Sequence, residues 1–138
     1  MPRLAARNDR EKEKMDKEWK IIFYKTETGK CPVNDFMKTL TKLEREKMGQ
    51  RIDELKTIGY NITRPKGSHL RDKIYELRIT VANNETRTLF FFEFENYIIL
   101  THSFIKKTNK VPESEINKAL KYKKDFLKRY NKSNIKGA

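Results

Sequence analysis

The stretch that decides the fold runs from Lys73 to Lys110 and reads KIYELRITVANNETRTLFFFEFENYIILTHSFIKKTNK. It contains three short runs rich in β-branched and aromatic residues, which favour strands. The pairs Asn83-Asn84 and Glu95-Asn96 separate the runs, and asparagine tolerates the left-handed backbone of a tight turn. Consecutive strands joined by such short turns pair antiparallel, so the sequence predicts a three-strand meander.

The order of apolar and polar residues predicts the place of each strand in the sheet. In the first run Leu77 and Ile79 point to one face, and Glu76 and Arg78 point to the other, which is the period of a half-buried strand. The second run, residues 87–94, is apolar on both faces, as expected of the central strand of a covered sheet. In the third run, residues 97–105, the same alternation predicts Leu100, His102 and Phe104 on one face.

The segment before the meander predicts one strand and two helices. Residues 19–25 are rich in β-formers and are expected to form an N-terminal strand. Pro32 suits the first position of a helix. Thr41 and Glu44 resemble a capping box, so a second helix should start there and end near Gly59. The inner stripe of that helix is predicted to consist of Leu43, Met48, Ile52 and Leu55.

The remaining residues are predicted to form a loop, a last helix and the two ends of the chain. Residues 60–72 are predicted to be a basic loop, and Pro112 is predicted to open a last helix with Glu113 and Glu115 in its first turn. We expect one domain over residues 18–131, with a charged extension at 1–17 and a loose tail at 132–138. The predicted class is α+β: a small, mainly antiparallel sheet of the meander plus the N-terminal strand, covered by a helical hairpin and a C-terminal helix.

Composition narrows the classes of function. A formal net charge of +13 over 138 residues attracts polyanions, so nucleic acid is the first partner to consider, although a lysine-rich surface without a ligand is the alternative. Cys31 is the only cysteine, which excludes an intramolecular disulfide and a thiolate zinc cluster. The sequence has no glycine-rich phosphate loop and no group of metal ligands around His69, so we predict neither a metal nor a cofactor. It has no apolar run of membrane-spanning length, and we expect a cytoplasmic protein.

Three short motifs carry a resemblance to a known family. Tyr-Glu-Leu-Arg stands at 75–78, His-x-Phe-x-Lys-Lys-Thr stands at 102–108, and Pro112 is followed by Glu115-Ile116. Together with the predicted order of strands and helices, they make residues 19–130 similar to the RelE-like toxins of type II toxin-antitoxin modules, in particular the phage-derived, HigB-type branch.

The resemblance implies an mRNA interferase, which is an endoribonuclease that cuts messenger RNA in the ribosomal A site, without a metal, and so inhibits translation. It also implies a cognate antitoxin, commonly a helix-turn-helix DNA-binding protein. Two alternatives stay open: a basic RNA- or ribosome-binding protein of the same fold that does not cut, and a protein whose only role is to titrate the antitoxin.

Cleavage of RNA by its own 2′-hydroxyl needs a proton acceptor, cations near the phosphate oxygens and a proton donor for the leaving 5′-oxygen. The resemblance places Arg78 and Arg87 in the second role, since a guanidinium stays charged and binds phosphate through two contacts. The alternative for both arginines is an ion pair with Glu76, Glu85 or Glu93.

Several residues are candidates for the proton transfers, and the sequence leaves all of them open. His102 titrates near neutrality, but a histidine between Leu100 and Phe104 is also typical of a core residue. Lys106 and Lys107 follow the last strand and suit a phosphate or a proton transfer. The predicted catalytic set is therefore Arg78, Arg87, His102, Lys106 and Lys107. The predicted substrate-binding set is Lys66, Arg71, Lys110 and Glu76, and Glu76 is also a candidate base.

Overall fold

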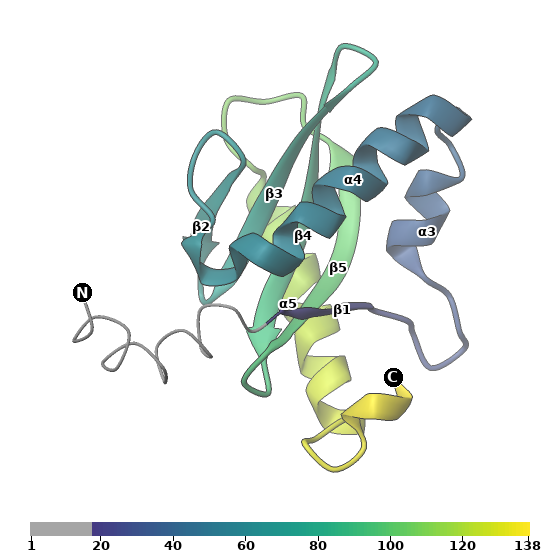
Figure 1. Cartoon of the computed structure of the whole chain (residues 1–138), viewed down its shortest axis with the longest axis vertical. Coiled ribbons are helices and arrows are strands. Elements are labelled where there is room, and N and C mark those ends of the chain that lie inside the picture. Colours follow the sequence, from purple (N-terminus) through teal and green to yellow (C-terminus); the bar gives the residue numbers. More distant parts are fainter. Residues whose placement is uncertain (1–17) are drawn as a thin grey trace, which may run out of the picture.

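A five-stranded sheet forms the centre of the structure, a computed structural model that describes residues 18–138 (Figure 1). The predicted extension at 1–17 lies outside the described residues. The strand order is β1-β5-β4-β3-β2, with β1 parallel to β5 and every other pair antiparallel. The strands are β1 (Lys20–Phe23), β2 (Gly67–Arg71), β3 (Ile74–Val81), β4 (Asn84–Glu93) and β5 (Tyr97–Ile105). The predicted α+β class, the meander β3-β4-β5 and its central strand β4 are confirmed.

The strand β2 corrects the prediction that residues 60–72 form only a loop. Its sequence is largely polar, and it is a strand because its backbone pairs with β3 at the edge of the sheet. Gly67 permits that pairing, since a Cβ there would lie 2.3 Å from the backbone oxygen of Glu76. A local alternation pattern cannot reveal such an edge strand, because its stability comes from its neighbour.

Three tight turns connect β2 to β5, and each has two consecutive residues in the left-handed region. These residues are Asp72 and Lys73, Ala82 and Asn83, and Phe94 and Glu95, with φ between 51° and 69°. Two left-handed residues define the turn that matches the twist of a hairpin. The last two turns therefore lie one residue earlier than predicted.

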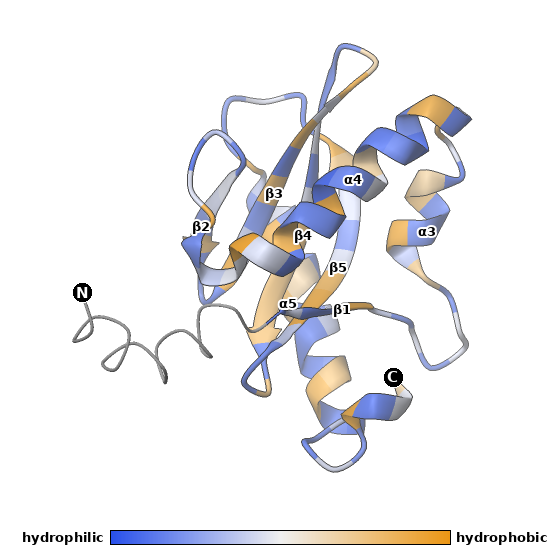
Figure 2. Cartoon of the chain, viewed as in Figure 1, coloured by the Kyte–Doolittle hydropathy of each residue, from blue (hydrophilic) through white to orange (hydrophobic). Residues whose placement is uncertain are grey.

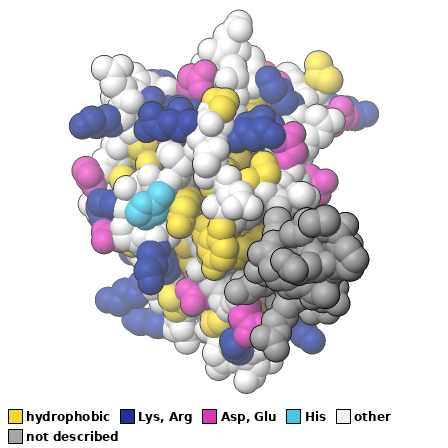
Figure 3. Space-filling view, turned by 60° about the vertical axis from the view of Figure 1, so that its left-hand side comes forward, with side chains coloured by type: hydrophobic (Ala, Val, Ile, Leu, Met, Phe, Trp, Pro, Cys, Tyr) yellow, Lys and Arg dark blue, Asp and Glu magenta, His cyan; other side chains and the backbone are white. Residues whose placement is uncertain are grey.

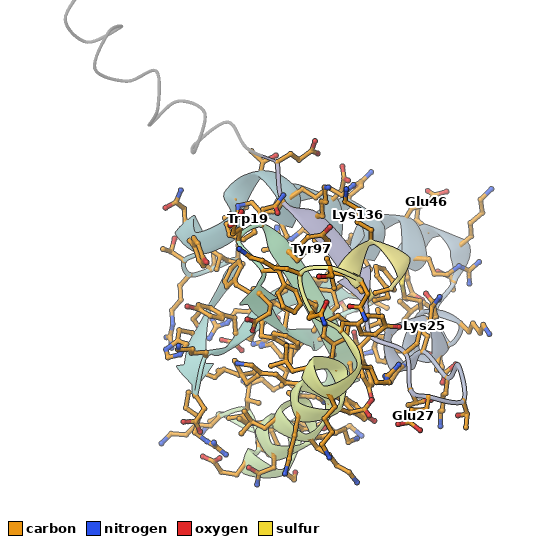
Figure 4. The ribbon with its side chains drawn as sticks, turned by 90° about the horizontal axis from the view of Figure 1, so that it is seen from below. Trp19, Lys25, Glu27, Glu46, Tyr97 and Lys136 are labelled. Carbon is orange, nitrogen blue, oxygen red and sulfur yellow. The ribbon has the colours of Figure 1, made fainter. Side chains whose placement is uncertain are left out.

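Helices cover both faces of the sheet. They are α3 (Pro32–Met37), α4 (Lys42–Ile58) and α5 (Glu113–Arg129). Seen from below, the sheet lies between α3 and α4 on one side and α5 on the other (Figure 4). The predicted capping box is confirmed: the Thr41 N–H donates to Glu44 Oε1 at 2.8 Å, and the Glu44 N–H donates to Thr41 Oγ1 at 3.2 Å.

The inner stripe of α4 is confirmed except at its start. Met48, Ile52 and Leu55 are buried, whereas Leu43 is 77% exposed. Figure 1 shows that the first turn of α4 projects beyond the sheet.

Two hydrophobic clusters hold these layers together. One lies between the sheet and α3-α4 and includes Leu77, Phe90, Ile98 and Leu100; the other lies between the sheet and α5 and includes Leu89, Phe91, Ile99 and Phe126. Figure 2 shows hydrophobic residues along β1 and β5 and hydrophilic ones over much of α4. Residues 132–138, expected to be loose, contain the short helical turn Ile135–Gly137, and Ile135 is buried in the second cluster.

An irregularity in β5 decides which face the end of this strand presents. His102 pairs with Leu89, but the next pair is Leu100 with Phe90, so Thr101 is an extra residue on β5. Such a β-bulge reverses the alternation beyond it. Leu100 therefore packs under α3-α4 while Phe104 belongs to the cluster under α5. The prediction that Leu100, His102 and Phe104 share one face is wrong for this reason.

Candidate functional site

Glu76 is the centre of a group of charged side chains on the face of the sheet that α5 covers. Arg87 donates from Nε to Glu76 Oε1 at 3.0 Å, and Arg78 donates from Nε to Oε2 at 3.0 Å. The hydroxyl of Ser68 on β2 donates to the same Oε2 at 2.5 Å. Both carboxylate oxygens of Glu76 are therefore engaged, and three strands contribute to one cluster.

The two arginines of this cluster differ in exposure. The Arg87 side chain is only 4% exposed, and its Nη1 donates to the backbone oxygen of Thr86 at 2.8 Å and to Glu85 at 3.3 Å. The Arg78 side chain is 26% exposed. A buried guanidinium is tolerated only when it is paired, as Arg87 is. Arg78 can therefore reach a ligand, whereas Arg87 holds Glu76 in place.

Cross-strand pairing shows how His102 lies relative to these groups. Arg78 pairs with Arg87, and Leu89 pairs with Glu76 on one side and with His102 on the other. The three predicted catalytic residues Arg78, Arg87 and His102 thus share one face, which is a consequence of the bulge in β5.

A first pocket of about 330 Å³ opens beside this cluster, between β2, β3 and the segment that joins β5 to α5. We call it the loop pocket. Its lining is Arg64, Ser68, His69, Leu70, Arg71, Glu76, Arg78, Lys106, Asn109, Lys110, Val111, Glu113 and Ile116. Five of these side chains are Arg or Lys and two are carboxylates, so the pocket favours an anion. On this side of the molecule, Lys and Arg side chains gather across the upper part of the surface (Figure 3).

A second pocket of about 420 Å³ lies on the other side of Arg78, between α4 and the free edge of β3. We call it the helix pocket. Its lining is Lys47, Arg51, Pro65, Lys66, Arg78, Ile79, Thr80, Glu85 and Arg87. Arg78 thus lines both pockets.

Of the four predicted lysines, two line the loop pocket, one lines the helix pocket and one lines neither. Lys106 is partly buried and lines the loop pocket, and its backbone N–H donates to the backbone oxygen of Glu85 at 2.7 Å. Lys110 is exposed and lines the same pocket. Lys66 lines the helix pocket and lies 3.4 Å from Glu54. Lys107 is exposed and lines neither pocket.

Arg71 lies at the far wall of the loop pocket and ties β2 to the start of α5. Its Nε donates to Glu113 Oε2 at 2.8 Å and its Nη2 donates to Asn117 Oδ1 at 2.7 Å. Its Nη1 donates to Asp72 at 2.5 Å. Because each of its three nitrogens has a partner in the protein, Arg71 has less capacity for substrate than Arg78.

His102 is buried under α5. Its Nε2 lies 3.1 Å from Glu115 Oε1, and its Nδ1 lies 3.1 Å from the hydroxyl of Thr101. Burial lowers the pKa of His102 to about 4, although the neighbouring Glu115 carboxylate acts in the opposite direction. The imidazole is therefore neutral at pH 7, and it lines neither pocket.

The site also includes residues that sequence reasoning missed. The Ser68 hydroxyl donates a hydrogen bond to Glu76. Two residues of α4, Lys47 and Arg51, line the helix pocket. The four-residue spacing of Lys47 and Arg51 places them on one helix face, which is a signal the sequence contains. That this face meets the edge of β3 depends on how α4 packs, and no local pattern gives it.

The described part of the chain has neither a group of metal ligands nor a membrane-spanning helix. Within residues 18–138 there is no group of three or more His, Cys, Asp or Glu side chains that could hold a metal ion. In the same part of the chain, no helix has the length and apolar character needed to cross a membrane.

Comparison with known proteins gives one family. The model of the family described as phage derived protein Gp49-like (DUF891) matches residues 35–124, which include α4, the whole meander and most of α5. Every residue of the Glu76 cluster and of the lining of both pockets lies inside this match. None of the curated proteins with which the sequence was compared matches it.

Proposed function

The chain belongs to the Gp49-like family of phage-derived proteins, a family of toxin type, and from this premise we propose that it is the toxin of a toxin-antitoxin module and acts as a ribosome-dependent mRNA endonuclease. The observation that carries the proposal is the position of Arg78. Its guanidinium is partly exposed and lines both basic pockets, and it donates to Glu76, which is buried and paired with Arg87. This geometry suits the phosphate of an RNA strand.

The proposed reaction is attack of the 2′-oxygen on the adjacent phosphorus. A new 2′-O–P bond forms, the P–O5′ bond breaks, and the products are a 2′,3′-cyclic phosphate and a free 5′-hydroxyl. Arg78 binds the non-bridging oxygens and stabilises the charge that grows on them. Lys106, which lines the same pocket, donates a proton to the leaving 5′-oxygen.

The proton acceptor is proposed from position. The Glu76 carboxylate is not free to take the proton, because its oxygens already accept three hydrogen bonds from Ser68, Arg78 and Arg87. Of the two histidines, His69 is exposed and lines the loop pocket, while His102 is buried and lines neither pocket. The His69 ring, however, packs on Tyr75 with ring centroids 4.9 Å apart, on the face of the sheet opposite to Glu76 and Arg78. We therefore assign proton acceptance to solvent in the loop pocket, and we assign His102 the role of joining β5 to α5 through Glu115.

A toxin-type family implies an antitoxin partner. We further propose that this partner is a helix-turn-helix protein, that the site of action is mRNA in the ribosomal A site, and that the protein works in the cytoplasm. HigB-type specificity belongs to the same proposal.

The test uses the full-length protein and ribosomes translating a defined mRNA. Primer extension should find new 5′ ends in the codon that occupies the A site. A single 2′-deoxy nucleotide on the 5′ side of the cut should abolish that cut, because the attacking hydroxyl is missing. Binding to ribosomes with no new 5′ ends would refute the enzyme and favour a non-cleaving basic RNA- or ribosome-binding protein.

A further inference from the structure

The helix pocket is not needed to bind the one phosphate that is cut. That phosphate is accounted for by Arg78 and Lys106, both of which line the loop pocket. The helix pocket lies on the opposite side of Arg78 and has its own cations from α4, Lys47 and Arg51. The helix pocket therefore has a role other than binding the phosphate that is cut.

The charges of the helix pocket are unbalanced. Its lining has five Lys or Arg residues, of which Arg78 and Arg87 are paired with Glu76. The single carboxylate of the lining, Glu85, is already hydrogen-bonded to Arg87 and Thr80. Among the described residues, no acid lies within ion-pair distance of Lys47. Lys66 and Arg51 share Glu54, at 3.4 Å and 3.9 Å. An excess of fixed positive charge around a pocket favours a bound anion.

Arg51 adds a second observation. Its Nη2 donates to the backbone oxygen of Arg78 at 3.1 Å, which fixes α4 to β3 at the residue that both pockets share. Its Nε is buried and has no hydrogen-bond acceptor within the described part of the chain. A buried donor without a partner is rare in folded proteins, and a water or an anion can supply the missing acceptor.

We propose that the helix pocket is a second phosphate site, which binds a backbone phosphate of the same RNA strand next to the one that is cut. This inference rests on the proposed function and names how its substrate is held. The strand crosses the edge of β3 over Arg78, with one phosphate in the loop pocket and a neighbouring one between Lys47, Arg51 and Lys66. Two anchored phosphates fix the position of the ribose between them, which one phosphate alone cannot do.

The test compares Lys47→Gln with a matched control. Lys47 is exposed, so its replacement leaves the core intact. Lys42→Gln removes the same charge from the same helix, at an exposed position that lines neither pocket. The probes are 2′-O-methyl RNAs, which cannot be cut: a dinucleotide with one phosphate and a pentanucleotide with four. Dissociation constants are measured over a range of salt concentrations.

Lys47→Gln should weaken binding of the pentanucleotide several-fold and lower the slope of log K against log salt by about 0.7, the value for one lost phosphate contact on a single strand. It should leave the dinucleotide unchanged, and Lys42→Gln should change neither probe. Equal losses in both variants, or no loss in Lys47→Gln, would overturn the second site.

The two proposals fail in different ways. If wild-type protein cuts mRNA on ribosomes while Lys47→Gln binds both probes like wild type, only the helix pocket is refuted. If Lys47→Gln behaves as predicted while wild-type protein makes no cuts, the second phosphate site stands as part of an RNA-binding surface and the nuclease is refuted.

Discussion

Arg87 donates its Nε–H to Glu76 Oε1 across 3.0 Å, and both side chains are almost completely buried. This pair stabilises the fold and also positions the site, because the second oxygen of Glu76 accepts from the partly exposed Arg78. The ion pair that was the alternative to a catalytic Arg87 is thus present. Loss of activity in an Arg87 variant would not by itself identify a catalytic group.

Arg87→Ala should destabilise the protein by about 3 to 5 kcal/mol, because it leaves the Glu76 carboxylate buried with less of its charge compensated. Urea unfolding followed by circular dichroism measures this free energy. Arg78→Ala is the matched variant, since Arg78 is partly exposed and its removal should cost about 1 kcal/mol. Similar losses in the two variants would contradict the division between a buried structural arginine and an exposed functional one.

The stability of the protein should fall as the pH falls from about 6.5 to about 4. Burial holds the pKa of His102 near 4, against an ordinary value of 6.5, so in this interval the unfolded chain binds a proton that the folded protein does not. The full effect is about 3 kcal/mol at pH 4, and it is absent above pH 7. Glu115 and Lys118 are the charged groups that face this imidazole.

Other carboxylates titrate in the same interval, so the measurement is a difference between variants. The free energy of unfolding of wild type and His102→Gln is determined at pH 7 and pH 4.5, with His69→Gln as the control at an exposed site. The wild type and His69→Gln should lose more stability than His102→Gln. Parallel losses in all three proteins would show that His102 is not buried in its neutral form.

Gly59→Ala should destabilise the protein by about 2 kcal/mol or more. Gly59 has φ +50°, and a Cβ there would lie 2.0 Å from Nε1 of Trp19, so the indole would have to move. Trp19 is the only tryptophan and packs on Tyr60 and Phe92, with ring centroids 4.6 and 5.0 Å away. Its fluorescence should therefore shift along with the midpoint of unfolding.

Gly49→Ala is the control for that experiment. Gly49 lies inside α4, and nothing lies within 4 Å of the position its Cβ would take. Alanine should stabilise this helix by up to about 1 kcal/mol. Destabilisation by Gly49→Ala, or none by Gly59→Ala, would contradict the packing described around Trp19.

Sequence reasoning found the features that depend on local patterns. Three of these features have a local cause, and the structure contains all of them. They are the alternation along residues 74–81, the run of β4 that is apolar on both faces, and the capping box at Thr41. The resemblance also singled out Arg78, Glu76 and Lys106, which line the loop pocket.

The features that sequence reasoning missed have a different cause. Each of them depends on how distant parts of the chain pack: the extra residue Thr101, the edge strand β2, and the position of Lys47 and Arg51 beside β3. Reading β5 with an unbroken alternation put His102 on the same face as Leu100, and only the pairing with β4 corrects this. The loop pocket needs residues from three separate segments, so its shape was not available from any one of them.

The most direct test of the account is the rate at which Arg78→Ala cuts mRNA on ribosomes in a single turnover, compared with wild type and with Lys42→Gln. Removing the group that stabilises the transition-state charge should lower the rate by about 100-fold or more, while the unfolding midpoint changes little. Lys42→Gln should cut at the wild-type rate. Cleavage by a folded Arg78→Ala protein at a rate within about threefold of wild type would contradict the central claim that Arg78 holds the phosphate that is cut.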